Sequence, residues 1–258
     1  MKSKMPTISV ITVVYNGENF LENTILSVGN QTYPNIEYLV IDGNSKDNTL
    51  AIIKQYENQI SRWISERDNG LYDAMNKGLY LATGDFVLFM NAGDEFRNNK
   101  VLEQIFSKYD AETDVLYGEV MMVDENRKAI GTRTEITTRK LPKNLTWKSM
   151  KLGMVVCHQA FIPRRELCPK YIENNLSADI DWVIKILKKS RKNIYTGIVI
   201  ADFLIGGVSK QRHRESLNNR YAVLQNHFGV IPNFLNHILI TIRAVWFKIV
   251  RIGKDSYS

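Results

Sequence analysis

The sequence predicts an α/β protein with a mostly parallel central sheet flanked by helices, and three stretches carry this prediction. Ile8–Val14 and Ile36–Ile41 are rich in residues that favour β-strands, and each run is followed by a polar turn and then a helical pattern. Phe86–Met90 is a run of five apolar residues between polar turns, which is typical of a strand buried on both faces. The alternation of strand and helix favours right-handed crossovers between parallel strands.

The remaining elements follow in order. Apolar residues at helical spacing predict three helices. The first covers Phe20–Val28, the second begins after Asp47, which can cap it, and the third covers Leu71–Ala82. The third helix leaves Tyr72, Asp73 and Asn76 together on its other side. Further along, the patterns predict strands over Asp114–Val123, Met154–Ile162 and Ile194–Ile205, and one more helix that begins at Ser177–Trp182. Residues 127–138 are expected to be extended and polar, and residues 139–152 to form a basic connection.

Charge is distributed unevenly along the 258 residues. Residues 1–138 carry 13 Lys and Arg against 20 Asp and Glu, and residues 139–258 carry 21 against 7. The formal net charges of the two halves are therefore −7 and +14. A basic half suits a phospholipid surface or a diphosphate-bearing molecule. We expect no nucleic-acid partner, because the basic residues are scattered and no recognition motif is present.

The location and redox state follow from weaker signals. The first residues lack a charged segment followed by an apolar segment, so we expect no export and a cytoplasmic protein. Cys157 and Cys168 have no metal-ligand spacing and do not make a disulfide framework, which favours a reducing compartment.

Polar residues follow the predicted strands at the points where ligands bind in open α/β sheets. Asp42 comes directly after the second strand, and Asn91 and Asp94 follow the strand at Phe86–Met90. Asp94 is the first candidate for a metal or phosphate contact. A simple turn is the alternative for both stretches, because Asn, Gly and Asp are all turn formers. No glycine-rich phosphate loop follows the first strand, which disfavours dinucleotide enzymes and P-loop proteins.

Two positions in the second half leave both a structural and a functional interpretation open. His158 is either a buried, hydrogen-bonded histidine or a site residue, together with Gln159. Asp179 and Asp181 lie in the first turn of a predicted helix, where carboxylates favour the helix dipole. For Asp181 this structural role is the favoured interpretation.

Four motifs resemble those of the family 2 glycosyltransferases, which have the GT-A fold. These are Ile8–Asn16, Val40–Thr49, Tyr72–Gly78 and Ala82–Asp85. Each motif is weak alone, and the set, which covers about residues 6–210, is specific. The chain is similar in particular to the bacterial branch that builds colanic acid and other surface polysaccharides.

The resemblance implies a donor site in the first half of the chain. Tyr15, Asp42 and Asp68 match positions that contact the nucleoside, with Asn76 and Lys77 nearby. The family's Asp-x-Asp motif holds a divalent metal on the diphosphate of the donor, and here it reads Asn91-Ala92-Gly93-Asp94. Asp94 therefore remains as the metal-binding carboxylate for Mg²⁺ or Mn²⁺, with Asn91 beside it, since hard cations accept few protein ligands plus phosphate and water.

The resemblance also implies roles on the acceptor side. Asp179 matches the carboxylate that acts as catalytic base, and His158 and Gln159 match a His-Gln pair near the acceptor. Ser209 and His213 are weaker candidates in a loop that the family folds over the donor diphosphate.

The C-terminal tail is expected to be a separate helical segment. Apolar residues from Phe234 to Val250 form one helical stripe, with Trp246 and basic residues such as Arg243 along it. This pattern predicts an interfacial membrane helix rather than a good transmembrane span, and packing on the catalytic domain or a second subunit is the alternative. The expected organisation is a catalytic domain over 1–215, with a donor half to about 125 and an acceptor half from 126, and a tail over 216–258.

The function expected from the sequence is an inverting glycosyltransferase at the cytoplasmic face of a bacterial plasma membrane. The donor would be a nucleotide sugar, with UDP as the expected nucleotide, and the acceptor a lipid-linked saccharide for capsule, exopolysaccharide or O-antigen synthesis. Two alternatives stay open: a metal-dependent sugar nucleotidyltransferase, and a non-catalytic membrane-associated scaffold subunit suggested by the altered Asp-x-Asp motif.

Overall fold

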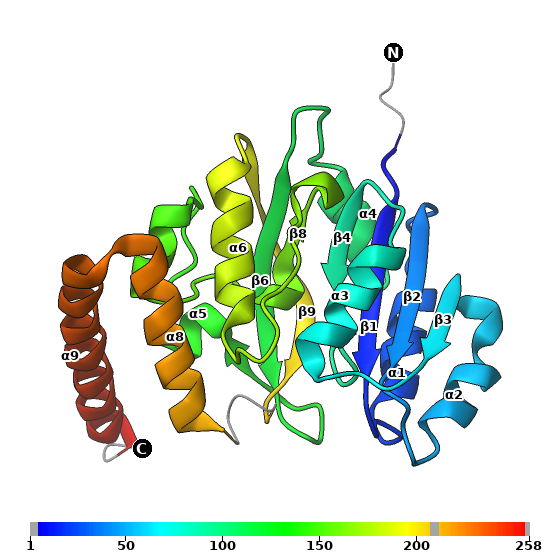
Figure 1. Cartoon of the computed structure of the whole chain (residues 1–258), viewed down its shortest axis with the longest axis horizontal. Coiled ribbons are helices and arrows are strands. Elements are labelled where there is room, and N and C mark those ends of the chain that lie inside the picture. The colour runs from blue at the N-terminus through cyan, green and yellow to red at the C-terminus, as the bar shows by residue number, and fades with distance from the viewer. Residues whose placement is uncertain (1–4, 207–211, 256–258) are drawn as a thin grey trace.

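A four-stranded parallel sheet forms the first half of the fold (Figure 1). The computed structural model describes residues 5–206 and 212–255. The strand order is β3-β2-β1-β4, with all three pairings parallel, and the bounds are β1 Ile8–Val14, β2 Ile36–Asp42, β3 Arg62–Ser65 and β4 Phe86–Phe89. The predicted parallel sheet is therefore confirmed.

A second, mixed sheet continues the fold in the order β5-β9-β6-β7, with β8 also paired to β6. Its bounds are β5 Glu95–Phe96, β6 Val115–Val123, β7 Ala129–Thr132, β8 Phe161–Pro163 and β9 Asn193–Leu204. β6 and β9 are parallel, whereas β8 runs antiparallel to β6 and forms an antiparallel bridge from Arg164 to Phe86 at the start of β4. Through β8, the two sheets therefore run in the same sense, and the carboxyl ends of their long strands lie at one edge.

Helices cover both faces of this arrangement (Figure 1). Their bounds are α1 Leu21–Gly29, α2 Thr49–Gln55, α3 Leu71–Leu81, α4 Val101–Phe106, α5 Arg133–Ile136, α6 Ala178–Lys189, α8 His213–Phe228 and α9 Val230–Asp255. Because α6 leads directly into β9, it runs against the strands, and its first turn lies at their carboxyl ends.

The core has two layers because successive residues of a strand point to opposite faces. Ile11, Leu39 and Phe89 pack with α3 and α6 on one face. Val10 and Val40 pack with α1 and α4 on the other. β4 is fully buried, as the continuous apolar run predicts, since it receives helices on both sides.

Two predicted elements differ in the structure. The strand expected over Met154–Ile162 is reduced to β8, because residues 158–160 form a 3₁₀ turn before it. The extended segment expected at 127–138 contains β7 and then α5, which begins with a capping box between Thr132 and Glu135. Both differences occur where short turns interrupt an otherwise extended chain.

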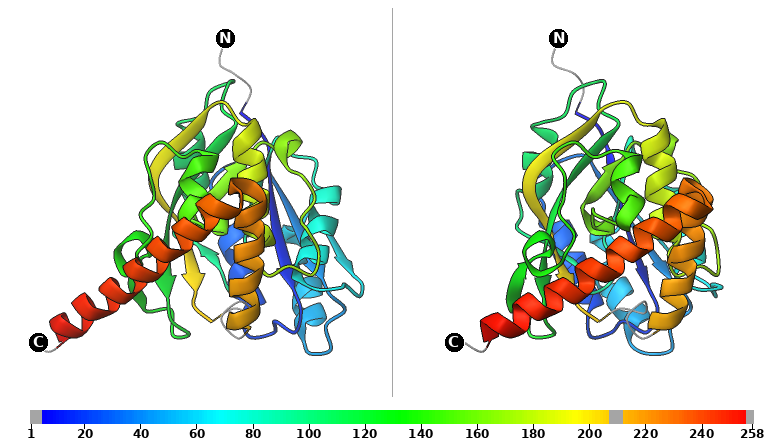
Figure 2. Two further views of the ribbon diagram at one scale, coloured as in Figure 1. Left: turned by 60° about the vertical axis from the view of Figure 1, so that its left-hand side comes forward. Right: turned by 90° about the vertical axis from the view of Figure 1, so that its left-hand side faces the viewer.

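The C-terminal tail is a pair of helices, α8 and α9, joined at Gly229, which has a positive φ of 85°. The expected start of the tail at residue 216 falls inside α8, and the expected division at residue 125 falls in the β6–β7 hairpin. α9 crosses one side of the molecule and extends beyond the body at its C-terminal end (Figure 2).

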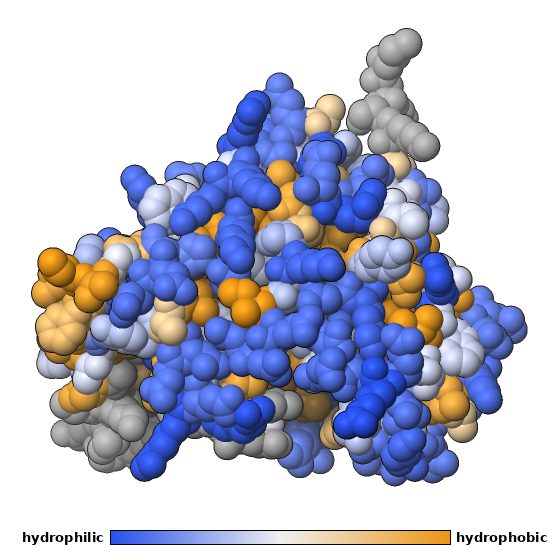
Figure 3. All heavy atoms as spheres, viewed as in Figure 1, coloured by the Kyte–Doolittle hydropathy of each residue, from blue (hydrophilic) through white to orange (hydrophobic). Residues whose placement is uncertain are grey.

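α9 presents an apolar surface to solvent. Its exposed apolar side chains are Val230, Ile231, Phe234, Leu235, Ile238, Leu239, Ile242, Val245 and Trp246. They form the apolar patch at the left edge of the molecule in Figure 3. By length and composition alone, Val230–Phe247 is apolar enough to cross a membrane. The interfacial interpretation from the sequence stays a prediction.

Candidate functional site

The loops that follow β1 and β2 are held together by side-chain to backbone hydrogen bonds. Asn16, with a left-handed φ of 50°, donates its backbone N–H to Ser45 Oγ over 2.8 Å and accepts the Lys46 N–H on Oδ1 over 2.9 Å. The Gly17 N–H bonds Thr49 Oγ1 at 2.9 Å. Asn tolerates this backbone conformation better than most residues. These contacts fix the rim where the two strands end.

Asp42 lies fully buried at the end of β2. Its carboxylate accepts hydrogen bonds from the hydroxyls of Ser45 and Ser65 and from the Ser45 backbone N–H. The sequence predicts Asp42 as a nucleoside contact. In the structure the Asp42 side chain lies beneath the rim and is hydrogen-bonded to two serines that the sequence patterns did not single out.

Tyr15 and Asp68 meet at Gly43, directly after Asp42. A Cβ at Gly43 would lie 2.3 Å from Asp68 Oδ2 and 3.3 Å from Tyr15 Cδ2, so a larger residue there would displace the Asp68 carboxylate. Tyr15 is 62% exposed at this rim. The structure therefore brings together the three residues that the resemblance assigns to the nucleoside, with an exposed aromatic ring beside a carboxylate.

Asn76 and Lys77 point away from this rim toward other backbone segments. Asn76 exchanges two hydrogen bonds with the Tyr171 backbone, donating to the carbonyl at 3.1 Å and accepting the N–H at 2.7 Å. Lys77 Nζ donates to the Arg67 carbonyl at 2.8 Å and pairs with Glu66 at 3.0 Å. Lys77 thus fixes the loop that carries Asp68. Both residues hold loops in place. Their proximity to the nucleotide stays a prediction.

Asp94 is buried behind the end of β4. Its Oδ1 accepts the Leu204 N–H at 3.1 Å and its Oδ2 accepts the Gln159 amide at 2.8 Å. Burial raises the pKa of Asp94 to about 7, and these two hydrogen bonds oppose the shift. Gln159 is therefore a partner of the predicted metal-binding carboxylate, not a surface group on the acceptor side.

Asn91 supplies a second oxygen near Asp94, whose N–H bonds the Asn91 carbonyl at 2.9 Å. Asn91 Oδ1 is buried and has no hydrogen-bond partner among the described residues. An oxygen without a partner, three residues before a carboxylate in the same turn, suits a hard divalent cation that also takes phosphate oxygens. No group of three or more acidic, His or Cys residues forms a ready metal cage in the described part of the chain. Asn91 and Asp94 fit a metal that is shared with a diphosphate.

His158 is a member of an aromatic cluster in the core. Its ring lies 5.0 Å from Phe89 and 5.4 Å from Trp182, and its Nε2 is 2.6 Å from the Tyr171 hydroxyl. Burial lowers the pKa of His158 to about 3, so the imidazole is neutral. The structure therefore contains the buried, hydrogen-bonded histidine that the sequence left open as one interpretation. The acceptor-side role of His158 stays a prediction.

Asp179 lies partly exposed in the first turn of α6 and accepts the Ile180 N–H at 2.9 Å. Burial raises its pKa, while the nearby guanidinium groups of Arg133 and Arg139 act in the opposite direction. The charge of Asp179 in turn helps to raise the pKa of the Tyr72 hydroxyl, which burial raises most. A carboxylate with a raised pKa and access to solvent suits a general base.

Asp181 differs from Asp179 although it is two residues away. It accepts a hydrogen bond from His227 Nε2 at 2.8 Å and pairs with Lys185 at 2.7 Å. These partners lower the pKa of Asp181 against the opposing effect of burial. The structural role favoured by the sequence is confirmed, since Asp181 joins α6 to α8.

The two candidate carboxylates face one region. Burial raises the pKa of the Cys157 thiol to about 11, and the charges of Arg133, Asp94 and Asp179 all act on this thiol. Asp94 and Asp179 are therefore both within electrostatic range of one side chain at the carboxyl edge of the strands.

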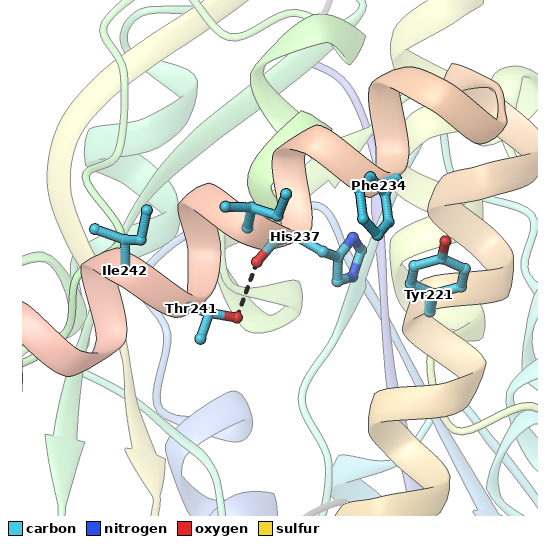
Figure 4. Close-up of a pocket in the computed structure, with 6 residues that line it drawn as sticks. Tyr221, Phe234, His237, Thr241 and Ile242 are labelled. Atoms are coloured by element: carbon cyan, nitrogen blue, oxygen red, sulfur yellow. Dashed lines mark hydrogen bonds between the residues drawn. The ribbon is translucent and has the colours of Figure 1, made fainter.

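Two groups of residues fall outside this region. Ser209 lies outside the described residues, and His213 begins α8. A cavity of about 380 Å³ lies between α8 and α9, away from the carboxylates. Figure 4 shows the His237 ring facing Tyr221 there, with centroids 4.7 Å apart.

Sequence reasoning missed Arg133 and Arg139. They belong to a stretch that the sequence analysis treated as an extended segment and a basic connection. In the structure they donate to one carbonyl, Met154 O, at 2.8 and 3.4 Å. Their only signal was the excess of positive charge in the second half of the chain.

Comparisons with known proteins agree with this arrangement. Glycosyl transferase family 2 matches residues 9–171. An uncharacterized glycosyltransferase of Mycobacterium tuberculosis is 42% identical over 100 residues, which is 38% of each chain. A PGL/p-HBAD biosynthesis glycosyltransferase of Mycobacterium bovis is 29% identical over 215 residues, or 79% of each chain. The chain thus aligns with about two-fifths of the length of the first of these relatives.

Solved structures show the same fold at low identity. Staphylococcus aureus TarS 1–349 in complex with UDP-GlcNAc has a TM-score of 0.63 at 19% identity, covering 85% of this chain and 67% of that one. The mannosyltransferase PcManGT from Pyrobaculum calidifontis, in complex with GDP-Man and Mn2+, has a TM-score of 0.63 at 17% identity, covering 85% and 64%. With the family match over more than half of its residues, the chain belongs to glycosyl transferase family 2 and has the GT-A fold.

Proposed function

We propose that the protein is an inverting glycosyltransferase that moves a sugar from a nucleotide-sugar donor to a lipid-linked acceptor. The observation that carries the proposal is the pairing of Asp94 and Asp179, which act on one thiol, Cys157, from different elements at the carboxyl edge of the strands. One carboxylate lies on the side of the donor loops and the other is partly open to solvent. A single displacement needs one group that stabilises the leaving diphosphate and another that takes the proton of the acceptor hydroxyl.

The donor side is formed by the rim at β1 and β2. Tyr15 offers an exposed aromatic face for a base, and Asp68, which like Tyr15 lies against Gly43, offers an acceptor for base or ribose donors. Asp42 acts from beneath by holding Ser45 and Ser65. UDP is the proposed nucleotide, and the bound UDP-GlcNAc of the TarS structure supports it.

Asp94 and Asn91 would hold Mg²⁺ or Mn²⁺ on the diphosphate, and the Mn2+ in the PcManGT structure supports this assignment. When bound, the cation stabilises the negative charge that develops on the leaving diphosphate. The Gln159 amide and the Leu204 N–H orient the Asp94 carboxylate for this task. Gln159 is thereby a positioning residue.

Asp179 serves the acceptor. An acceptor hydroxyl attacks the anomeric carbon while the bond to the diphosphate breaks, and Asp179 takes the hydroxyl proton. The charges of Arg133 and Arg139 favour the ionised form of this carboxylate and partly oppose the rise in its pKa that burial causes. Because no protein nucleophile takes part, one displacement inverts the configuration at the anomeric carbon.

The lipid-linked acceptor is supported by α9 and its surroundings. The helix exposes apolar side chains along its length, and the basic second half of the chain suits an anionic membrane surface. We propose that α9 rests on the inner face of a bacterial plasma membrane. Synthesis of a surface polysaccharide is the proposed pathway.

The test is product formation from a panel of nucleotide sugars. The full-length protein is incubated with UDP-, GDP- and dTDP-sugars, Mn²⁺ and a bacterial lipid extract, and mass spectrometry searches for a lipid heavier by one sugar. We expect a product with one donor class, absent in Asp179→Asn. If no donor is consumed or bound under any metal condition, a non-catalytic scaffold explains the chain better.

A further inference from the structure

Three arginines from separate segments lie within electrostatic range of one another, and two of them, Arg133 and Arg139, act on Asp179. Arg133 belongs to α5, Arg139 follows it, and Arg220 belongs to α8. Arg133 and Arg139 share the Met154 carbonyl, and the charge of Arg220 acts on Arg139. We call Arg133, Arg139 and Arg220 the arginine cluster.

The cluster has more positive charge than its surroundings balance. Burial lowers the pKa of Arg139 to about 9, and the like charges of Arg133, Arg220 and Arg243 add to this effect. Asp179 is the carboxylate that acts in the opposite direction. Packing like charges together is unfavourable unless an anion joins them.

The cluster also contains hydrogen-bond donors that have no acceptor among the described residues. Arg133 Nη1 and Arg220 Nε are buried without a hydrogen-bond partner in the part of the chain that the structure describes. The Arg139 bond to Met154 is long, at 3.4 Å. Guanidinium groups with unfilled donors form strong, charge-assisted bonds to phosphate oxygens.

The position of the cluster distinguishes the acceptor from the donor. The donor rim at Tyr15 and Gly43 belongs to β1 and β2, whereas the arginines lie on the elements around α6 and the tail. Arg243 of α9 donates to the carbonyl of Thr138, directly before Arg139. The apolar helix is therefore joined to the body next to the cluster and next to the proposed base.

We propose that the arginine cluster binds the phosphate or diphosphate group of the acceptor lipid, which places the sugar attached to that group at Asp179. This inference rests on the proposed function and specifies its acceptor. The lipid chain would follow the apolar face of α9, the phosphate would accept hydrogen bonds from the unpartnered guanidinium donors, and the acceptor hydroxyl would lie toward the carboxylate.

The test uses the full-length protein and three probes: farnesyl diphosphate, farnesol and UDP with Mn²⁺. Dissociation constants are measured by calorimetry for the wild type, Arg139→Met and Arg220→Met, substitutions that keep much of the side-chain volume. Arg191→Met is the matched control, because Arg191 is an exposed arginine on a different surface, near Asp114 and Arg164. It removes the same charge from the chain without touching the cluster.

We expect each cluster variant to weaken farnesyl diphosphate binding at least tenfold, while farnesol and UDP binding change less than twofold and the control binds all three normally. Because each substitution relieves repulsion between guanidiniums, the thermal midpoint at low salt should stay or rise. A purely structural role would lower the midpoint and leave the binding of farnesyl diphosphate unchanged, which would overturn the inference.

Two further results would also overturn it, and they differ in what they say of the function. An equal loss of UDP and farnesyl diphosphate binding would assign the cluster to the donor diphosphate. Normal UDP binding by a wild type that does not bind farnesyl diphosphate would remove the acceptor site and leave the proposed transferase intact. If UDP also fails to bind, the proposed function fails together with the inference.

Discussion

Replacing Asp179 by Asn changes the proposed base with little change in shape. The Asn Oδ1 can still accept the Ile180 N–H, which Asp179 accepts at 2.9 Å. The variant loses the ability to take the acceptor proton, and positioned general bases contribute about 10²–10⁴-fold to the rate. This corresponds to roughly 3–5 kcal/mol of activation free energy.

The same helix supplies the control. Asp181→Asn removes an ion pair with Lys185 and weakens the hydrogen bond with His227, and His227 and Asp181 have side chains only 9% and 7% exposed. Breaking a buried pair costs about 3 kcal/mol, at the low end of the usual range, because the Lys185 side chain is 40% exposed. For a chain of this size, that lowers the thermal midpoint by roughly 6–12 °C.

The two variants should therefore differ in opposite ways: Asp179→Asn mainly in kcat, and Asp181→Asn mainly in thermal stability. Turnover with a saturating donor and the thermal midpoint are measured for both proteins. Asp179→Asn should lose at least a hundredfold in kcat with unchanged UDP binding and with a smaller fall in midpoint than Asp181→Asn. Asp181→Asn should lose stability and keep kcat within about threefold. An Asp179→Asn protein with more than a tenth of wild-type kcat would refute the assignment of the base.

Three more predictions follow from single contacts. Gly43→Ala should weaken UDP binding at least tenfold in calorimetry with little loss of stability, because its Cβ would lie 2.3 Å from Asp68 Oδ2 at the rim; unchanged binding would place the nucleoside elsewhere. The pKa of His158 is lowered to about 3 by burial, so its contribution to stability is complete above pH 6.5 and is lost as pH falls toward 3, at up to about 1.4 kcal/mol per pH unit. The variant His158→Gln should show a shallower loss of unfolding free energy over that range in urea titrations, and an identical slope would contradict the neutral, buried state. Replacing Ile238 and Trp246, which are 44% and 68% exposed, by Ser should abolish sedimentation with anionic vesicles and leave UDP binding intact; retained sedimentation would argue against α9 as the membrane contact.

Much of the fold could be predicted from the sequence because its signals are local. The apolar run at Phe86–Met90 and the β-branched runs before it fix strands that helices cover on both sides. The rim residues Tyr15 and Asp68 also came together as the resemblance implies, since parallel strands bring their carboxyl ends to one edge. These predictions needed no knowledge of distant contacts.

The differences arise where distant segments decide the environment of a side chain. Gln159 reaches Asp94 only because β8 pairs with β6 and bridges to β4. His158, one residue earlier, turns into the core because residues 158–160 form a 3₁₀ turn. Local sequence patterns do not contain this tertiary information.

The arginine cluster could not be predicted for the same reason. Arg133 and Arg220 are 87 positions apart in the sequence, and only the folded chain brings both near Arg139. The charge asymmetry indicated that the second half would contact an anion. It did not indicate which of the many basic side chains would lack partners.

The central claim is that a nucleotide-sugar donor binds at the strand ends with a metal held by Asp94. The most direct measurement is a calorimetric titration of UDP, GDP and dTDP, with and without Mn²⁺, into the wild type and Asp94→Ala. The account predicts that one nucleoside diphosphate binds in a Mn²⁺-dependent manner and that this dependence is lost in Asp94→Ala. Binding that is the same in both proteins and indifferent to Mn²⁺ would contradict the role of Asp94, and no binding of any nucleotide would contradict the donor site itself.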